Sequence, residues 1–143
     1  MSEATETAQR FIDRTVTNIS SLADVYADRA VIEMPFAAPL FPALREVTRD
    51  ELRAGFTRLG GPRYTDVSDV RIHETTDPST AVLEYRLHGV SDIEEQTFAL
   101  DYIMVITTRE GLIVHSRDYS SLVQAAQALG ITERLITALS PNV

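Results

Sequence analysis

The feature that most constrains this fold is a β-rich region in the second half of the chain. Apolar residues alternate with polar ones, and β-branched and aromatic residues are frequent, in segments over about residues 64–74, 80–90, 95–107 and 112–119. The connections are short and carry Asp77-Pro78, Ser91-Asp92 and Arg109-Glu110-Gly111, which favour turns. Because short connections join antiparallel neighbours, this region predicts a four-stranded antiparallel meander.

Helical patterns precede the meander. Apolar residues recur at helical spacing over about residues 4–18, and Ser20-Ser21 can cap a short second helix, followed by a strand over 30–33. Residues 34–42 carry three prolines among large apolar residues, which excludes a helix or a central strand there. The capping-box spacing at 48–51 predicts another helix, with Leu52, Phe56 and Leu59 on one face and an end at Gly60-Gly61-Pro62.

After the meander, a helix over 122–129 with Gly130 as its left-handed cap is expected, and residues 131–139 favour one more. Helices, then a meander, then closing helices are typical of an α+β fold. We expect a curved antiparallel sheet of four to six strands, wrapped by the N-terminal helices into a cone with an internal pocket. At 143 residues, the chain is predicted to form a single domain over 1–143.

Charge and composition narrow the function. The formal charge of −8 disfavours nucleic acid and anionic membranes as partners, because both select clustered Lys and Arg. There is no apolar run long enough to span a bilayer, and the acidic start is unlike a secretion signal, so a cytoplasmic protein is expected. With no cysteine and three widely spaced histidines, the sequence offers no metal motif, and no cofactor is predicted.

Asp101 is a candidate catalytic group because it interrupts a strand that is apolar on both alternating faces. That strand is expected to be central and covered on each side, and Asp101 shares its face with Ala99, Ile103 and Val105. A carboxylate in such a place is either paired or has its pKa raised by desolvation, and both situations are frequent at active sites. The alternative is a structural Asp bonded to a neighbouring Tyr, Arg or backbone amide.

Asp118 and Glu33 are the other candidate carboxylates. Alternation places Asp118 on one face of its strand with Leu112, Val114 and Ser116, and places Ile113, His115, Arg117 and Tyr119 on the other. The alternative for Asp118 is an N-cap of the helix that begins near Ser121. Glu33 ends its strand beside the proline-rich segment, where it could lie at a cavity rim or equally at an exposed edge.

Several other residues are expected to line the pocket. Tyr85 shares a face with Leu83 and Leu87, so its phenol could donate to a ligand oxygen or simply pack in the core. His88 and His115 could be general bases, although a lone His on a strand is more often a half-exposed surface residue. The remaining pocket walls are predicted to be Phe11, Met34, Phe36, Phe56 and Met104.

Several motifs resemble those of one superfamily. The stretch Tyr26-Ala27-Asp28-Arg29-Ala30-Val31-Ile32-Glu33-Met34-Pro35 resembles the opening strand of the nuclear-transport-factor-2-like superfamily. Arg109-Glu110-Gly111-Leu112-Ile113, followed by Arg117-Asp118-Tyr119, resembles the last strands of the same superfamily. Together these look like the branch of SnoaL-like polyketide cyclases and ketosteroid isomerases, while residues 73–78 are similar to phenazine-biosynthesis members. The resemblance covers about residues 6–130 and implies a cystatin-like α+β roll.

The resemblance also assigns roles residue by residue. Asp118 matches the base of the polyketide aldol cyclases and a site Asp of the limonene-epoxide hydrolases, and Asp101 resembles the oxyanion-hole Asp of the isomerases. Other family residues are replaced: the cyclase His by Met104, the hydrolase Arg-x-Asp by Tyr85-Arg86-Leu87, and the isomerase Tyr and base by Phe11 and Met34. Two carboxylates in unequal environments suit acid and base catalysis without a cofactor.

We therefore expect a small enzyme of secondary metabolism, as in antibiotic biosynthesis, that isomerises or cyclises an apolar, oxygenated, polyketide-like intermediate. Asp118 would be the base, Asp101 the acid or oxyanion donor, and Glu33 an orienting or second acid group. The alternatives are a non-catalytic binding protein for an apolar metabolite and an epoxide-opening enzyme. The resemblance also implies a homodimer through the outer sheet face, with which Tyr85, Leu87 and Tyr102 are compatible.

Overall fold

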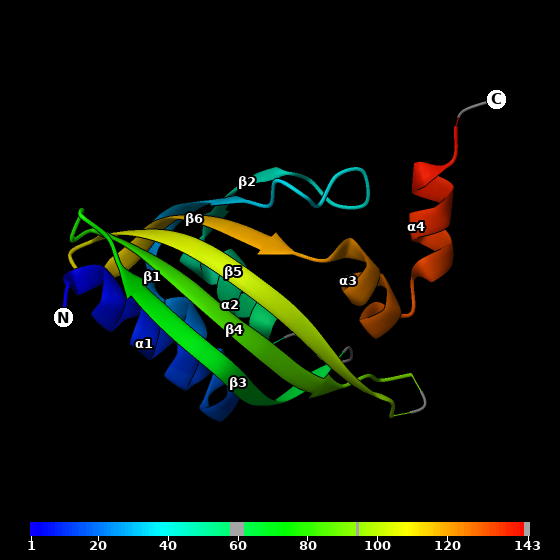
Figure 1. The fold of residues 1–143 in the computed structure, drawn as a ribbon, viewed down its shortest axis with the longest axis horizontal. Helices are drawn as coiled ribbons and strands as arrows, with labels where there is room; N and C mark the ends of the chain where they lie inside the picture. Colours follow the sequence, from blue (N-terminus) through cyan, green and yellow to red (C-terminus); the bar gives the residue numbers. More distant parts are fainter. Residues whose placement is uncertain (58–61, 94, 142–143) are drawn as a thin grey trace.

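Six strands form one curved sheet in the order β2-β1-β6-β5-β4-β3 (Figure 1). The computed structural model describes residues 1–57, 62–93 and 95–141. The strands are β1 (Tyr26–Glu33), β2 (Leu44–Thr48), β3 (Arg63–Glu74), β4 (Thr80–Val90), β5 (Thr97–Arg109) and β6 (Leu112–Ser120). The predicted meander corresponds to β3 through β6, and the α+β class is confirmed.

The first half of the sheet differs from the prediction. Strand β1 begins at Tyr26 rather than at residue 30, and β2 was not predicted at all. The two strands pair antiparallel, but β1 pairs parallel with β6, with Glu33 opposite Arg117. The sheet is therefore mixed, because β1 and β6 come together from distant parts of the chain, and alternation along a strand carries no information about such a partner.

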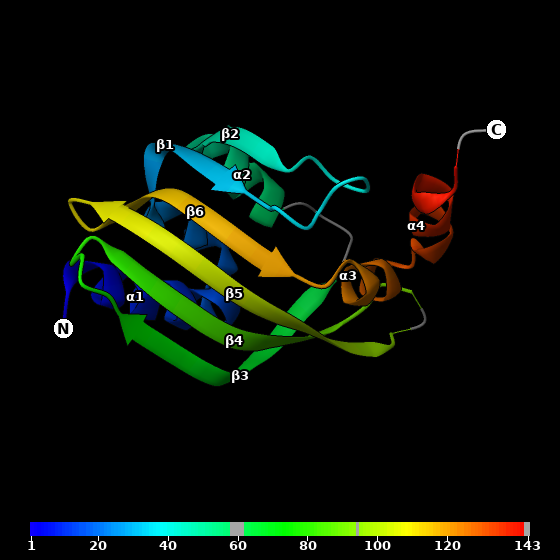
Figure 2. The same ribbon diagram turned by 45° about the horizontal axis from the view of Figure 1, so that its top comes forward.

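Helices on the N-terminal side cover one face of the sheet, which we call the inner face (Figure 2). Helix α1 (Glu3–Thr17) contacts β3, β4 and β5, and α2 (Arg49–Phe56) contacts β1, β2 and the 3₁₀ helix η1 (Ile19–Val25). The predicted capping box is present at Thr48 and Glu51, each side chain bonding the other's backbone N–H. Leu59, Gly60 and Gly61, where this helix was predicted to end, lie outside the described residues.

Helices α3 (Leu122–Leu129) and α4 (Thr132–Leu139) close the chain. Ser121 caps α3, and Gly130 ends it in the left-handed conformation at φ 66°, as predicted. The N-cap alternative for Asp118 is therefore wrong. Helix α3 contacts β5, whereas α4 contacts α3 and stands away from the sheet (Figures 1 and 2).

Alternation along β4 shows which side chains face the helices. Ala81, Leu83, Tyr85 and Leu87 are buried, whereas the residues between them are half-buried. Strand β6 breaks its alternation, because a register shift against β5 lies at Val114. Ile113 and Ser116 are consequently both fully buried, which corrects the prediction that they lie on opposite faces.

No helix in the described part of the chain combines the length and the apolar character that crossing a bilayer requires.

Candidate functional site

Asp118 projects from β6 into the interior. It lies opposite Met104 of β5, which is 2% exposed, and two residues from the fully buried Ser116 on the same face. The Ser116 hydroxyl donates a hydrogen bond to one carboxylate oxygen of Asp118. Asp118 therefore shares a face with Ser116, as predicted, whereas the register shift at Val114 ends the predicted alternation toward Leu112.

Burial controls the protonation of Asp118. Loss of hydration raises the pKa of its carboxyl from 3.8 to about 6, and the Ser116 hydrogen bond and the nearby His115 oppose part of that rise. A group with this pKa is substantially ionised at neutral pH and takes up a proton readily. That property suits a carboxyl that removes a proton and then returns it.

Three tyrosines lie around this carboxyl: Tyr26 and Tyr85, which are buried, and Tyr102, which is half-buried. Burial is the main cause of the raised pKa of each phenol, and the Asp118 carboxylate adds to it. The rings of Tyr85 and Tyr102 stack with centroids 5.3 Å apart, and the Tyr85 hydroxyl lies 3.6 Å from the Met104 sulfur. All three phenols stay protonated at neutral pH, so each remains a hydrogen-bond donor beside a carboxylate.

Phe11 of α1 packs against two of these tyrosines. Its ring meets those of Tyr85 and Tyr26 edge-on, with centroids 6.1 and 6.4 Å apart. Phe11 and Tyr85 are each 6% exposed, so both close off the interior from solvent. Aromatic contacts of this geometry stabilise the arrangement beyond simple area burial.

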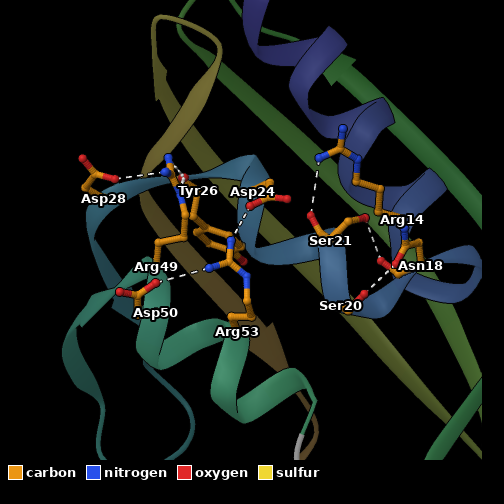
Figure 3. Close-up of polar contacts among 10 residues, drawn as sticks. All are labelled: Arg14, Asn18, Ser20, Ser21, Asp24, Tyr26, Asp28, Arg49, Asp50 and Arg53. Atoms are coloured by element: carbon orange, nitrogen blue, oxygen red, sulfur yellow. Dashed lines mark hydrogen bonds and ion pairs between the residues drawn. The ribbon is translucent and has the colours of Figure 1, made fainter.

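Helix α2 fixes Tyr26 through its backbone (Figure 3). Arg49 donates from Nε and Nη2 to the Tyr26 carbonyl oxygen, at 3.0 and 2.8 Å, and its Nη1 lies 3.0 Å from Asp28. One turn further, Arg53 bridges Asp24 and Asp50. These contacts hold the junction of η1 and β1 against α2, and with it the tyrosine at the start of β1.

A cavity of about 380 Å³ opens from the interior between the inner face, the proline-rich segment and α3. Its described lining is Met34, Ala37, Phe41, Arg45, Pro62, Tyr64, Phe98, Leu100, Tyr102, Ser120, Leu122, Ala125, Ala128 and Leu129. Two of these lining residues lie close to Asp118. The Asp118 charge contributes to the raised pKa of Tyr102, and Ser120 follows Asp118 by two residues on β6. The volume is in the range of small-molecule sites.

The other predicted pocket residues divide between the two faces. Met34 lines the cavity, Met104 faces the interior, and Phe56 packs partly buried against the core. Phe36 does not face the interior: it is 63% exposed, and its ring lies 5.3 Å from that of Tyr119 on the outer face. Proline-rich segments follow no period, so the sequence could not assign the direction of this side chain.

Asp101 and Glu33 lie on the outer face, away from Asp118. Asp101 is 53% exposed, and its carboxylate accepts hydrogen bonds from Arg86 at 3.2 and 3.3 Å and from Gln124 at 2.7 Å. Glu33 pairs with His115 at 2.7 Å. The structure does not bring the three carboxylates together, and the expected cover over Asp101 is incomplete in this chain.

Register explains this separation. Asp118 pairs with Met104 on the inner face, and Asp101, three residues before Met104, has the opposite orientation. The same alternation turns the side chains of Tyr85, Leu87 and Tyr102 inward, although the sequence had made them compatible with a dimer contact on the outer face. Tyr26 and Tyr102 were missed as site residues, although Tyr102 shares the parity of the buried Leu100 and Met104.

Within residues 1–57, 62–93 and 95–141, no group of three or more His, Asp or Glu side chains could hold a metal ion.

Comparisons with known proteins agree with this geometry. Residues 8–116 match the model of the SnoaL-like domain. An uncharacterised PhzA/B-like protein of Pseudomonas aeruginosa is 31% identical over 110 residues, which are 77% of each chain. A crystal structure of a candidate isomerase from Bacillus subtilis superposes with a TM-score of 0.78 at 23% identity, covering 90% of this chain and 94% of that one.

A candidate polyketide cyclase from Pseudomonas putida has the same fold. It superposes with a TM-score of 0.71 at 16% identity, covering 90% of this chain and 98% of that one. The family match spans most of the sheet and the N-terminal helices, and the structural matches extend over the whole roll. The chain therefore belongs to the SnoaL-like family of the nuclear-transport-factor-2-like superfamily.

Proposed function

We propose that this protein isomerises or cyclises an apolar, oxygenated small molecule by proton transfer, without a cofactor. The observation that carries the proposal is the Asp118 carboxyl, which lies mostly buried on the inner face with its pKa raised to about 6 and protonated phenols around it. The SnoaL-like family and the similarity to a candidate cyclase and a candidate isomerase support a cyclase, isomerase or ligand-binding role.

The reaction begins with a ketone held near Asp118. The carboxylate removes a proton from the carbon next to the carbonyl, and a tyrosine O–H donates to the carbonyl oxygen as negative charge moves onto it. In an isomerisation, protonated Asp118 returns the proton to a different carbon of the enolate. In a cyclisation, the enolate carbon attacks a second carbonyl of the same molecule, and the proton goes to the new alkoxide oxygen.

The surroundings favour this step. Phe11, Tyr85 and Met104 exclude bulk water, which strengthens the interaction between a phenol and a developing oxyanion. The hydrogen bond from the Ser116 hydroxyl fixes the orientation of the Asp118 carboxylate. We infer that Asp101 and Glu33, which face outward, take no part in the chemistry. A polyketide-like substrate of secondary metabolism is the class that the family favours.

The test is deuterium exchange of 2-tetralone, an apolar bicyclic ketone with acidic protons next to its carbonyl. The wild type is expected to accelerate deuterium uptake from heavy water, measured by proton NMR. Asp118→Asn is expected to lose about 10²- to 10⁴-fold of that acceleration, the usual contribution of a general base. Asp101→Asn is the matched control and should retain the wild-type rate. Equal rates for the wild type and Asp118→Asn would contradict the proposal.

The second candidate is a non-catalytic binding protein for an apolar metabolite. The outward positions of Asp101 and Glu33 favour it, because they remove the carboxylate partners that the sequence predicted for Asp118. The same samples discriminate between the two. Binding of 2-tetralone at one equivalent, with no deuterium uptake above the buffer rate, would identify a carrier rather than a catalyst.

We further propose that a second copy of the chain covers the outer face. A groove of about 630 Å³ lies there, lined by the exposed Phe36 and Ile103, the half-buried Tyr119 and the Arg86–Asp101 ion pair. Phe36 and Ile103 are 63% and 44% exposed, which is unusual for large apolar residues that lie near each other on one surface. A homodimer through this face is also what the resemblance implies.

A further inference from the structure

We infer that the natural ligand is an organic anion, with an apolar body inside the 380 Å³ cavity and a carboxylate or similar group on Arg45 at its mouth. This inference rests on the proposed use of the interior as the ligand site, and it names the class of ligand.

The charge of the cavity lining is the first argument. Of the fourteen described lining residues, Arg45 is the one that carries a charge, and apart from Tyr64, Tyr102 and Ser120 the others are apolar. An apolar cavity with one cation is complementary to a ligand with an apolar body and one negative group. A neutral hydrocarbon-like ligand would gain nothing from the guanidinium.

The lack of an internal partner for Arg45 is the second argument. Arg49, Arg53 and Arg86 each form an ion pair with an Asp. The side chain of Arg45 forms no ion pair and no hydrogen bond with any described residue. The same holds for Arg29, Arg63, Arg71, Arg109, Arg117 and Arg134, but among the described arginines Arg45 alone lines this cavity. A guanidinium offers five donors in a planar fork that fits a carboxylate, and those donors remain available here.

Strand β2 explains the position of Arg45. Val47 is buried against the core, and Arg45 lies two residues earlier, so both point to the inner side of the sheet. Glu46 between them points the other way and cannot neutralise Arg45 from its own strand. Arg45 is exposed, which places it at the open end of the cavity rather than in its depth.

The two ends of the cavity differ in charge, and this difference orients the ligand. Arg45 lies at the mouth, whereas Tyr102 and Ser120 lie on the wall that adjoins Asp118. An anionic group is attracted to the first end and repelled by an ionised carboxylate at the second. The ligand therefore enters with its uncharged, reactive end toward Asp118 and keeps its negative group in partial contact with water.

The test compares 2-naphthoate with methyl 2-naphthoate, which share an apolar body and differ in charge. The wild-type chain has three methionines, so protein labelled with ¹³C at the methionine methyl groups gives one signal each for Met1, Met34 and Met104, and each Arg→Met variant adds one further signal from the substituted position. Met34 lines the cavity and Met1 is 87% exposed, so the ring current of a bound naphthyl group should shift Met34 and leave Met1 unchanged. Titration of these signals gives the affinity of each probe.

Arg45→Met is expected to weaken naphthoate binding about tenfold, the usual effect of a partly exposed charge-assisted hydrogen bond, and to leave ester binding within about twofold. Ester binding also reports that the variant is folded. Arg109→Met is the matched control, because Arg109 is exposed at the opposite end of β5 from the cavity. It should leave both affinities unchanged.

Four results would overturn the inference: naphthoate binding no tighter than the ester, unchanged naphthoate affinity in Arg45→Met, equal weakening in Arg109→Met, or binding that does not shift Met34. Asp118→Asn should bind naphthoate at least as tightly as the wild type, because it removes a negative charge. Loss of deuterium exchange is measured separately, so a failed catalytic proposal and a failed anion site give different results.

Discussion

The two faces of the sheet place the same side chain, an aspartate, in opposite environments. On the inner face, Asp118 is enclosed by tyrosines and its pKa is raised to about 6. On the outer face, Asp101 is half exposed and bound by Arg86 and Gln124. Loss of hydration dominates at Asp118, whereas Asp101 forms an ion pair in contact with solvent, and the proposed proton transfer therefore rests on Asp118.

Adjacent residues of β5 give the sharpest test of this comparison. Met104 is 2% exposed on the inner face, and Ile103 is 44% exposed on the outer face. Met104→Ala should lower the free energy of unfolding by about 2–5 kcal/mol, because it removes buried contacts and leaves a cavity. Ile103→Ala should cost less than about 1 kcal/mol in the monomer, since much of the side chain is already hydrated.

Urea denaturation followed by circular dichroism measures both variants at a low protein concentration. Similar losses for Met104→Ala and Ile103→Ala would mean that the two faces are equally buried in solution. That result would contradict the assignment of one inner and one outer face.

The pH dependence of stability tests the inner face alone. The unfolded carboxyl of Asp118 loses its proton near pH 3.8 and the folded one near pH 6, so the folded state holds a proton that the unfolded state has released. Rising pH therefore lowers the free energy of unfolding across this window, by up to about 3 kcal/mol, and the loss is complete above it.

Asp118→Asn removes this titration and keeps the shape of the side chain. We expect the variant to be more stable than the wild type by about 1–3 kcal/mol at about pH 8, and the difference to vanish near pH 3.5. Thermal unfolding across the pH range measures it, with Asp101→Asn as the control that should show no gain. A wild type as stable as Asp118→Asn at alkaline pH would show that the Asp118 carboxylate is well solvated.

Much of the fold could be predicted from local patterns. The spacing of the first helix, the capping box at Thr48, the turn sequences and Gly130 all act over a few residues, and each is found where it was expected. Strand β2 and the parallel pairing of β1 with β6 could not be predicted in this way. Both depend on which distant segment lies alongside, and no short-range pattern contains that information.

The site was predicted less completely for the same reason. Alternation correctly separated Asp101, Ile103 and Val105 from the other face of β5, but it did not reveal which face the helices cover. The register shift at Val114 also reversed the orientation of Ile113 relative to Ser116. Asp118 was identified from its motif and its strand, whereas its tyrosine neighbours come from three strands and required the folded sheet.

The smallest expected effect concerns the outer face, at the Arg86–Asp101 ion pair. Both side chains are about half exposed, so Arg86→Gln should lower the free energy of unfolding of the monomer by less than about 1 kcal/mol, and less still at high salt. A second copy over this face would desolvate the pair and make its loss depend on protein concentration. Light scattering and urea denaturation of the wild type and Arg86→Gln over a range of concentrations separate the two cases. A constant monomer mass, with the same small loss at every concentration, would contradict the proposed dimer and leave the outer face as solvent-exposed surface.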